Sequence, residues 1–356
     1  MVQGTESRLT RWLLTRWYGG RPPALLLPLA TLFGLVTALR RSMFRHGGFR
    51  RHSMPVAVIV VGNLLVGGAG KTPTVAAVVD GLQRRGRRPG VVCRGYGGSI
   101  TSARLLEADT PAAECGDEPL LLKRRLQVPV AIGRDRPAAA RLLLARHPEV
   151  DCLVCDDGLQ HYALARDIEL VVIDRARGFG NGALLPAGPL REKPGRLRQA
   201  SAVIWQGPRL DTRVAEALEA QLPAAMPTWT LELEMAAPRP LQGGTTRPWS
   251  DWMGVRVHAA AGIASPTRFF AGLRAHGLAL IEHAFPDHFA FQAADLAFTG
   301  DEPILMTEKD AVKCEWASAS DTACRYWVVP LDAHLSEPFF DWLITRLEQL
   351  RGSETA

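Results

Sequence analysis

Cysteine is scarce in this chain and does not recur in pairs. The 356 residues include six cysteines, of which only Cys152 and Cys155 stand at a spacing typical of metal ligands. No second pair accompanies them, and both fall in a short apolar run that predicts a buried strand. A disulfide-stapled small domain is excluded, because 47% hydrophobic residues suffice to form packed cores. We interpret the cysteines as small buried side chains in a reducing cytoplasm.

Internal repeats and long low-complexity tracts are also missing from the sequence. Their absence argues against a repeat array and, together with the hydrophobic content, against a disordered chain. The length predicts about two domains. The net charge of +6 indicates anionic partners, and much of the excess lies near the N-terminus.

The N-terminal region has no small-residue cleavage site after its apolar stretch, which argues against a secretory signal peptide. Residues 22–39 are uncharged and contain three prolines. As a helix they would span about 27 Å, slightly less than the roughly 30 Å of membrane hydrocarbon. We expect a helix lying in the membrane interface, with a core-packed helix and a true span as alternatives. The flanking arginines, which suit anionic lipid, are Arg8, Arg11, Arg16, Arg21, Arg40, Arg41, Arg45, Arg50 and Arg51.

A glycine-rich loop lies between the apolar run 56–61 and a helical pattern over residues 74–85. Small residues let backbone N–H groups close on phosphate oxygens, Lys71 reaches the β- and γ-phosphates, and the Thr72 hydroxyl joins a Mg²⁺ shell. The strict pattern has glycine where this chain has Leu65, so a plain strand-to-helix turn is the alternative. The flanking strand and helix favour a nucleoside triphosphate site. Its residues are Gly67, Gly68, Ala69, Gly70, Lys71 and Thr72.

A second site-forming segment is Asp156-Asp157-Gly158, which follows the apolar run 150–155. Parallel α/β sheets bind ligands at the carboxyl ends of their strands. A carboxylate there can hold Mg²⁺, directly or through water, opposite Thr72. The alternative is a simple turn. Beside a phosphate-binding loop, we expect Asp156 and Asp157 to be metal ligands.

Apolar strand-like runs alternate with helical patterns through the first two thirds of the chain. This alternation predicts an α/β fold, a parallel sheet with helices on both faces. Residues 229–235 then alternate apolar and polar side chains, typical of a strand with one wet face, and residues 255–257 could pair back with them. We expect a two-stranded connector to a smaller C-terminal α/β domain. The predicted parts are a membrane-associated helical segment 1–50, a phosphate-loop core 51–227, the connector 228–258 and the smaller domain 259–356.

Polar clusters follow several of the predicted strands, at the edge of the sheet where ligands bind. Each has an ordinary alternative: Asp117 as a helix N-cap, Arg94 and Arg136 as surface charges, and His161 as a loop histidine. Together they indicate a pocket for a polar, anionic substrate. The clusters are Arg94-Gly95-Tyr96-Gly97-Gly98, Gly116-Asp117-Glu118-Pro119, Gly133-Arg134-Asp135-Arg136 and Gln160-His161.

Seven motifs, in order along the chain, resemble the signatures of the tetraacyldisaccharide 4′-kinase family. The similarity extends from about Arg16 into the C-terminal region. The motifs are Val61-Gly62-Asn63 with residues 66–73, residues 94–98, residues 116–119, residues 156–161, residues 185–192, Phe285-Pro286-Asp287-His288 and residues 307–313.

The resemblance implies ATP-dependent phosphorylation of the 4′-hydroxyl of a tetraacylated glucosamine disaccharide 1-phosphate, a late step of lipid A synthesis. It implies that residues 67–72 cradle ATP, that Asp156 and Asp157 serve Mg²⁺, and that Asp117 and His288 form a catalytic pair. Without it, His288 would be interpreted as a loop histidine. The residues implied to line the site are Arg94, Tyr96, Arg136, Gln160, His161, Arg191 and Glu192.

The residues alone indicate a membrane-associated phosphoryl-transfer enzyme, in which Mg²⁺ and the loop neutralise the transferring group. The sugar lipid comes only from the resemblance. The alternative is a nucleotide-switched membrane protein that acts on a protein partner. We expect a monomer at the cytoplasmic face of the bacterial inner membrane, with the glycolipid and the membrane surface as partners and no nucleic acid.

Overall fold

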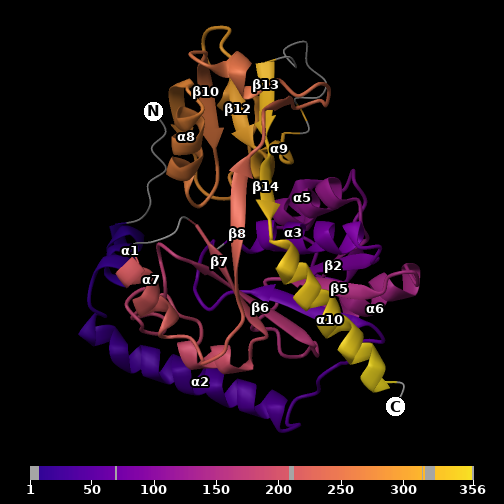
Figure 1. Cartoon of the computed structure of the whole chain (residues 1–356). Helices are drawn as coiled ribbons and strands as arrows, with labels where there is room; N and C mark the ends of the chain where they lie inside the picture. The colour runs from indigo at the N-terminus through magenta and orange to yellow at the C-terminus, as the bar shows by residue number, and fades with distance from the viewer. Residues whose placement is uncertain (1–7, 69, 208–211, 315, 317–324, 355–356) are drawn as a thin grey trace.

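Two β-sheets with flanking helices make up the chain (Figure 1). The computed structural model describes residues 8–68, 70–207, 212–314, 316 and 325–354. A nine-stranded sheet forms the core domain, and a five-stranded sheet forms the smaller domain above it in Figure 1. The predicted fold class, α/β with a large parallel sheet and a second small domain, is confirmed.

The large sheet is parallel from β8 through β4, with antiparallel strands only at its two edges. Its order is β14-β8-β7-β6-β1-β5-β2-β4-β3. The inner strands β2, β4, β5, β6 and β7 are buried along their whole length, which explains their continuous apolar runs. The strands are β1 (Ala57–Gly62), β2 (Pro89–Cys93), β3 (Arg104–Leu105), β4 (Val130–Ile132), β5 (Cys152–Asp156), β6 (Ile168–Asp174), β7 (Ala202–Gln206), β8 (Thr228–Met235) and β14 (Leu331–His334).

Helices cover both faces of this sheet. One face packs on α3, α5 and α10 in a single large cluster, and α6 packs on a second cluster on the opposite face. A third cluster joins β6 and β7 to α2, α7 and the segment 179–197. The helical elements of the core are α3 (Lys71–Arg84), α4 (Ala112–Cys115), α5 (Asp117–Leu126), α6 (Arg136–Arg146), η2 (Pro194–Gln199), α7 (Thr212–Glu219) and α10 (Glu337–Glu354).

The smaller domain is built on a sheet of order β11-β10-β12-β13-β9, parallel except at β9. Alanines and bulky apolar side chains of β10 and β12 meet α8 on one face. Its elements are β9 (Arg239–Pro240), η3 (Trp249–Trp252), β10 (Arg256–Ala261), α8 (Pro266–Ala275), β11 (Ala279–Ala284), η4 (Ala293–Leu296), β12 (Ile304–Thr307), α9 (Glu308–Ala311) and β13 (Tyr326–Val329). Thr307 caps α9 by accepting a hydrogen bond from the Asp310 amide.

The connection between the domains corrects two predictions. Residues 255–257 do not pair with β8: Val257 opposes Leu280 in the small sheet. The antiparallel partner of β8 is β14, in which Leu331 opposes Met235. The chain therefore returns to the core, and α10 belongs to the core rather than to a domain 259–356. Its Phe340 ring fills the space beside Gly81 of α3, where any Cβ would overlap it.

The N-terminal helices lie along the outside of the core domain: α2 runs along the end away from the smaller domain, whereas α1 lies at the side of the core, nearer to the smaller domain (Figure 1). They are α1 (Arg8–Gly19), η1 (Ala24–Leu26) and α2 (Leu27–Arg45). By length and composition, the helical stretch 24–45 could cross a membrane, which is weak evidence for a span. Only 6% of its most apolar window is buried in the protein. This exposure argues against the core-packed alternative.

All five cysteines in the described ranges are buried. Cys152 and Cys155 lie in β5, at the centre of the large sheet. The prediction that cysteines serve as small core side chains is confirmed for these five, and Cys324 lies outside the described residues.

Candidate active site

The glycine-rich loop joins β1 to α3, as its position between a strand and a helix predicts. Gly67 and Gly70 adopt φ angles of 99° and 77°, in the left-handed region that favours glycine. A Cβ on Gly70 would lie 2.9 Å from the Gln206 side chain, so the loop also needs glycine there for space. Helix α3 begins at Lys71, and its N-terminus supplies unpaired N–H groups and a positive dipole end. Ala69 lies outside the described residues.

Lys71 is held at the sheet edge by two acceptors. Its Nζ lies 3.4 Å from Oδ1 of Asn63 and 3.6 Å from Oδ1 of Asp157. Asn63, at the end of β1, is fully buried. Asn63 belongs to one of the family-like motifs, but the sequence analysis predicted no role for it. Its position directly after a predicted strand was the signal that could have placed it in the site.

Asp156 ends β5 and faces Thr72 at the start of α3. The Thr72 hydroxyl donates to Oδ2 of Asp156 over 3.2 Å, whereas Oδ1 is buried without a hydrogen-bond partner among the described residues. Burial raises the pKa of Asp156 to about 7, and the nearby charges of Glu118 and Asp157 add to the effect. A cation bound here would relieve both the missing partner and the repulsion.

Asp157 has a different environment, although it is the next residue. It has a φ of 47° and lines the cavity, where the Arg191 guanidinium donates to both of its oxygens over 3.3 and 3.4 Å. Burial would raise the pKa of Asp157, but Lys71 and Arg191 outweigh it and hold the pKa below its ordinary value.

The residues present fit a magnesium ion. The Thr72 hydroxyl and the Asp156 carboxylate face each other, Asp157 follows at the cavity wall, and one buried oxygen of Asp156 has no hydrogen-bond partner among the described residues. No group of three or more His, Cys, Asp or Glu side chains in the described part of the chain could hold a metal. A small protein ligand set is typical of Mg²⁺, which takes its remaining ligands from water and substrate phosphates.

Asp117 and His288 meet across the two domains. Asp117 begins α5 of the core, and His288 follows β11 of the smaller domain with a φ of 61°. His288 Nδ1 lies 2.9 Å from Oδ1 and 3.1 Å from Oδ2 of Asp117. The predicted contact between these residues, 171 positions apart, is confirmed.

The pKa values of this pair are shifted in opposite directions. The hydrogen bond with Asp117 raises the pKa of His288 above its ordinary value, against the opposing effects of burial and Lys309. Burial would raise the pKa of Asp117, but the hydrogen bond with His288 and the charge of Lys309 outweigh it and lower the pKa. Asp117 is therefore an ionised carboxylate that orients the imidazole.

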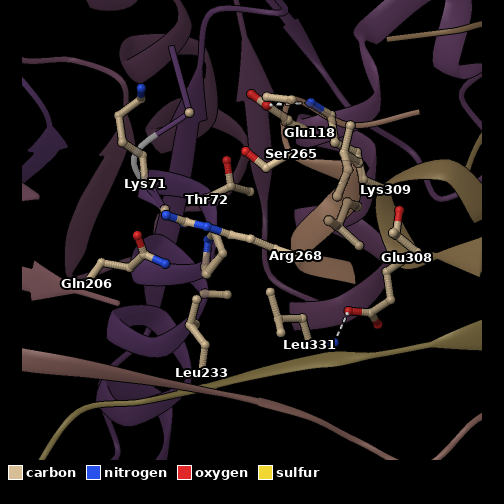
Figure 2. A pocket seen from close by; sticks show the side chains of 18 of the residues that line it. Lys71, Thr72, Glu118, Gln206, Leu233, Ser265, Arg268, Glu308, Lys309 and Leu331 are labelled. Atoms are coloured by element: carbon tan, nitrogen blue, oxygen red, sulfur yellow. Dashed lines mark hydrogen bonds and ion pairs between the residues drawn. The ribbon is translucent and has the colours of Figure 1, made fainter. Parts of the chain in front are cut away.

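Lys309 of α9 is a site residue to which sequence analysis gave no role. Its Nζ lies 3.1 Å from Oε1 of Glu118, 3.2 Å from Oδ1 of Asp287 and 3.4 Å from Nε2 of His288. Figure 2 shows the Lys309 and Glu118 side chains directed at one another. Because an ammonium only donates, the neutral His288 ring accepts at Nε2 and carries its proton on Nδ1, toward Asp117.

One large cavity joins these groups. It has a volume of about 1420 Å³ and is lined by the phosphate loop, Asp156, Asp157, α5, β8, α8 and α9. Residues from both domains face it in Figure 2, among them Lys71, Gln206, Arg268 and Glu308.

Ion pairs connect the domains around this cavity. Nη2 of Arg268 lies 2.8 Å from Oδ2 of Asp174. Arg125 of the core lies 2.6 Å from Glu308 of the smaller domain, and its guanidinium is also held by Asp332 of β14, within the core, at 2.6 Å. These contacts fix the smaller domain, and with it His288, over the phosphate loop.

The structure separates the predicted lining residues into two groups. Arg94, Tyr96 and Arg191 line the cavity, and the Tyr96 ring lies 5.5 Å from the His288 ring.

Arg136, Gln160, His161 and Glu192 are not among the residues that line the cavity, which corrects their predicted placement. Arg136 is 2% exposed and donates to the Asp156 carbonyl over 2.8 Å, so it supports the end of β5 from below. Burial and the charges of Arg136 and Arg166 lower the pKa of His161 to about 4.

Comparison with known proteins shows one consistent similarity. Residues 23–348 match the model of the family described as tetraacyldisaccharide-1-P 4′-kinase. A tetraacyldisaccharide 4′-kinase of Dechloromonas aromatica is 47% identical over 354 residues, which cover 98% of this chain and 100% of the relative. One of Stenotrophomonas maltophilia is 46% identical over 338 residues, which cover 94% of this chain and 96% of the relative.

A solved structure is also similar over most of its length. It is an apo form of LpxK from Aquifex aeolicus in complex with ATP. The TM-score is 0.75 at 26% sequence identity, and the match covers 91% of this chain and 98% of that one.

Proposed function

The chain belongs to the tetraacyldisaccharide-1-P 4′-kinase family, and we propose that it transfers the γ-phosphoryl group of ATP to the 4′-hydroxyl of a tetraacylated glucosamine disaccharide 1-phosphate in lipid A synthesis. The observation that carries the mechanism is that His288, held by its hydrogen bond with Asp117, lines the same cavity as the phosphate loop. A kinase needs these two parts, a base for the acceptor hydroxyl and a cradle for the phosphates, at one site.

His288 serves as the base in this proposal. Asp117 holds Nδ1–H, so the Nε2 lone pair is available to the cavity once the acceptor hydroxyl replaces Lys309. The hydroxyl proton passes to Nε2 as the oxygen bonds to the γ-phosphorus. The bond from that phosphorus to the bridging oxygen breaks, and ADP leaves with the electron pair. Lys309, displaced from Nε2, stays charged close to the transferred group.

The residues on the nucleotide side would bind the phosphates of ATP by positive charge and by correctly placed backbone amides. The backbone amides of Gly67, Gly68 and Gly70 and the N-terminus of α3 would bind the β- and γ-phosphates. Lys71 would exchange its acceptors Asn63 and Asp157 for phosphate oxygens. Thr72, Asp156 and Asp157 would hold Mg²⁺. When bound, Mg²⁺ neutralises phosphate charge.

The substrate's anionic and sugar groups would meet Arg94, Tyr96 and Arg191, which line the cavity. The acyl chains of such a substrate lie in a bilayer. The exposed leucines of α2 would place the protein on the membrane surface, at the cytoplasmic face of the bacterial inner membrane, as a monomer.

The test is phosphoryl transfer from labelled ATP to a tetraacyl disaccharide 1-phosphate in mixed micelles. We expect label in the lipid, and none when the 4′-hydroxyl is already blocked. Release of inorganic phosphate alone, unaffected by the lipid, would instead support a nucleotide-switched protein.

A further inference from the structure

Helix α2 has two apolar faces with different surroundings. On one face, Ala30 is buried and Phe33 is half-buried against the core. Gly34 lies so close to the core that a Cβ on it would be 2.6 Å from Cδ1 of Leu184. The opposite face is exposed. Its most exposed residues are Leu29, Leu32, Leu35, Val36 and Leu39, between 54% and 64% exposed. The helix therefore packs on the core domain with one face and leaves its other apolar face open for a membrane surface.

Arg41 extends the packed face of α2 into a buried polar cluster. Its Nη1 donates to Oε2 of Glu192 over 3.2 Å. Glu192 is 5% exposed and also accepts from the Tyr162 hydroxyl over 2.5 Å, and Arg196 lies 3.8 Å away. A carboxylate this deeply buried depends strongly on its donors, because burial removes the water that would replace them.

The same carboxylate leads to the phosphate loop. Oε1 of Glu192 accepts from Gln160 over 3.3 Å, and Gln160 Oε1 accepts from Arg191 over 3.3 Å. Arg191 donates to Asp157, which also pairs with Lys71. These contacts form one continuous path from Arg41 of α2 to Lys71 of the glycine-rich loop. Gln160 and Glu192, predicted to line the cavity, lie in the middle of this path.

We propose that this path couples the seating of α2 on an anionic membrane to the affinity of the site for ATP, with Arg41, Glu192 and Gln160 as positioning residues. The proposal rests on the proposed function for the identity of the nucleotide. It adds a regulation, in which the enzyme binds ATP more tightly when it is on the membrane that carries its acceptor.

The sign of the coupling follows from the charges around Asp157. Arg191 and Lys71 share that carboxylate, and Gln160 holds Arg191 in place. If the path is loosened at Arg41, Arg191 is less well held and the Asp157 charge attracts Lys71 alone. Lys71 is then less available to phosphate. A membrane that fixes the exposed face of α2 favours the seated helix and therefore tighter ATP binding, and by linkage ATP tightens membrane binding by the same factor.

The experiment measures the affinity for a fluorescent ATP analogue in EDTA, with and without phosphatidylethanolamine vesicles that contain phosphatidylglycerol. We expect vesicles to tighten binding to the full-length protein by about 5-fold or more, and the nucleotide to tighten vesicle binding equally. Arg41→Gln and Glu192→Gln should each remove the effect, and the double variant should match the single ones, because they break one path.

Arg45→Gln is the matched control, since it removes one exposed positive charge from the same helix. It should weaken vesicle binding about as much as Arg41→Gln. It should, however, keep the wild-type ratio between the ATP-analogue affinity measured with vesicles and the affinity measured without them. If Glu192→Gln does not fold, Arg41→Gln, whose side chain is 33% exposed, decides the matter alone.

Three results would overturn the coupling. The first is that vesicles leave the ATP-analogue affinity of the wild type unchanged. The second is that Arg41→Gln keeps the wild-type ratio of affinities with and without vesicles. The third is that Arg45→Gln loses that ratio as fully as Arg41→Gln. Because neither acceptor lipid nor metal is present, failure of the proposed kinase reaction would be seen separately, as missing label in the lipid.

Discussion

The acceptor side and the nucleotide side of the cavity differ in how far the protein alone completes them. On the acceptor side, Asp117, His288, Lys309 and Glu118 satisfy one another through contacts of 2.9 to 3.4 Å across two domains. On the nucleotide side, Asp156 has a buried oxygen without a described partner, and Lys71 rests on weaker contacts of 3.4 and 3.6 Å. The base is therefore preorganised, whereas the phosphate site keeps charges that only its ligands complete.

The largest expected effect is on the nucleotide side. Lys71→Ala should lower phosphoryl transfer by at least about 10³-fold, because no other Lys or Arg of the loop supplies charge to the β- and γ-phosphates. Transfer to lipid and the circular dichroism spectrum would be measured together. Wild-type turnover in a folded variant would contradict the assignment of the phosphate loop.

On the acceptor side, His288→Ala and Asp117→Ala should each lower kcat by about 10²–10⁴-fold. The double variant should lose little more than the worse single variant, since the two residues act as a unit. Binding of ATP should barely change. Multiplicative losses would indicate two independent roles, and an unchanged kcat in His288→Ala would remove that residue from the mechanism.

Asp156→Asn should separate function from stability. The Mg²⁺ concentration for half-maximal activity should rise by about 10–100-fold, as for other groups that hold or orient a metal. Without nucleotide, the melting temperature should stay equal or increase, because a buried carboxylate short of partners is replaced by a neutral amide. A lower melting temperature would mean that the Asp156 charge supports the fold without ligand.

A smaller effect is expected in the pH dependence of kcat/KM. The base must be unprotonated, so kcat/KM falls as the pH drops below the pKa of His288. Lys309 lowers that pKa and Asp117 raises it. Lys309→Gln should therefore move the acidic limb to higher pH, and Asp117→Asn should move it to lower pH. Lys309→Arg, which keeps the charge, should leave the limb near its wild-type position; an equal shift in Gln and Arg variants would indicate a steric cause.

The smallest effect on chemistry in micelles should come from the exposed face of α2. Replacing Leu29, Leu32 and Leu39 by Gln removes apolar area that only a membrane would cover. The protein should shift from the membrane to the soluble fraction with nearly unchanged micellar turnover. Removal of residues through Arg41 should have the same effect on localisation, and sedimentation of either variant with vesicles would place the anchor elsewhere.

Sequence patterns predicted the parallel sheet and the loop at the end of β1 well, because strands buried on both faces are continuous apolar runs. They did not predict the partner of β8. Alternation shows which face of a strand is wet but not which strand pairs with it, and Leu331 lies 96 positions beyond Met235 (331 minus 235).

The candidate site, like the fold, could be predicted only in part from the sequence. Position after a strand located Asp156 and Asp157 at the correct edge, but the contact between Asp117 and His288 followed only from the family resemblance. Spacing does not tell whether a side chain enters the cavity or lies beneath it. Arg136 and Glu192 were placed wrongly for that reason, since both are buried behind the site.

The pairing of Met235 with Leu331 has one more consequence. The smaller domain leaves and re-enters the core through two residues that face each other, so it is an insertion within a continuous core sequence. Deleting residues 236–330 and joining the ends by a two-residue turn would convert β8 and β14 into a simple hairpin. The shortened chain should fold by itself and keep the nucleotide loop while losing His288 and Lys309, and cooperative melting together with retained ATP binding would demonstrate it. Nucleotide binding and acceptor activation would then be separable in one gene product, as if a second domain had been inserted into an older nucleotide-binding protein.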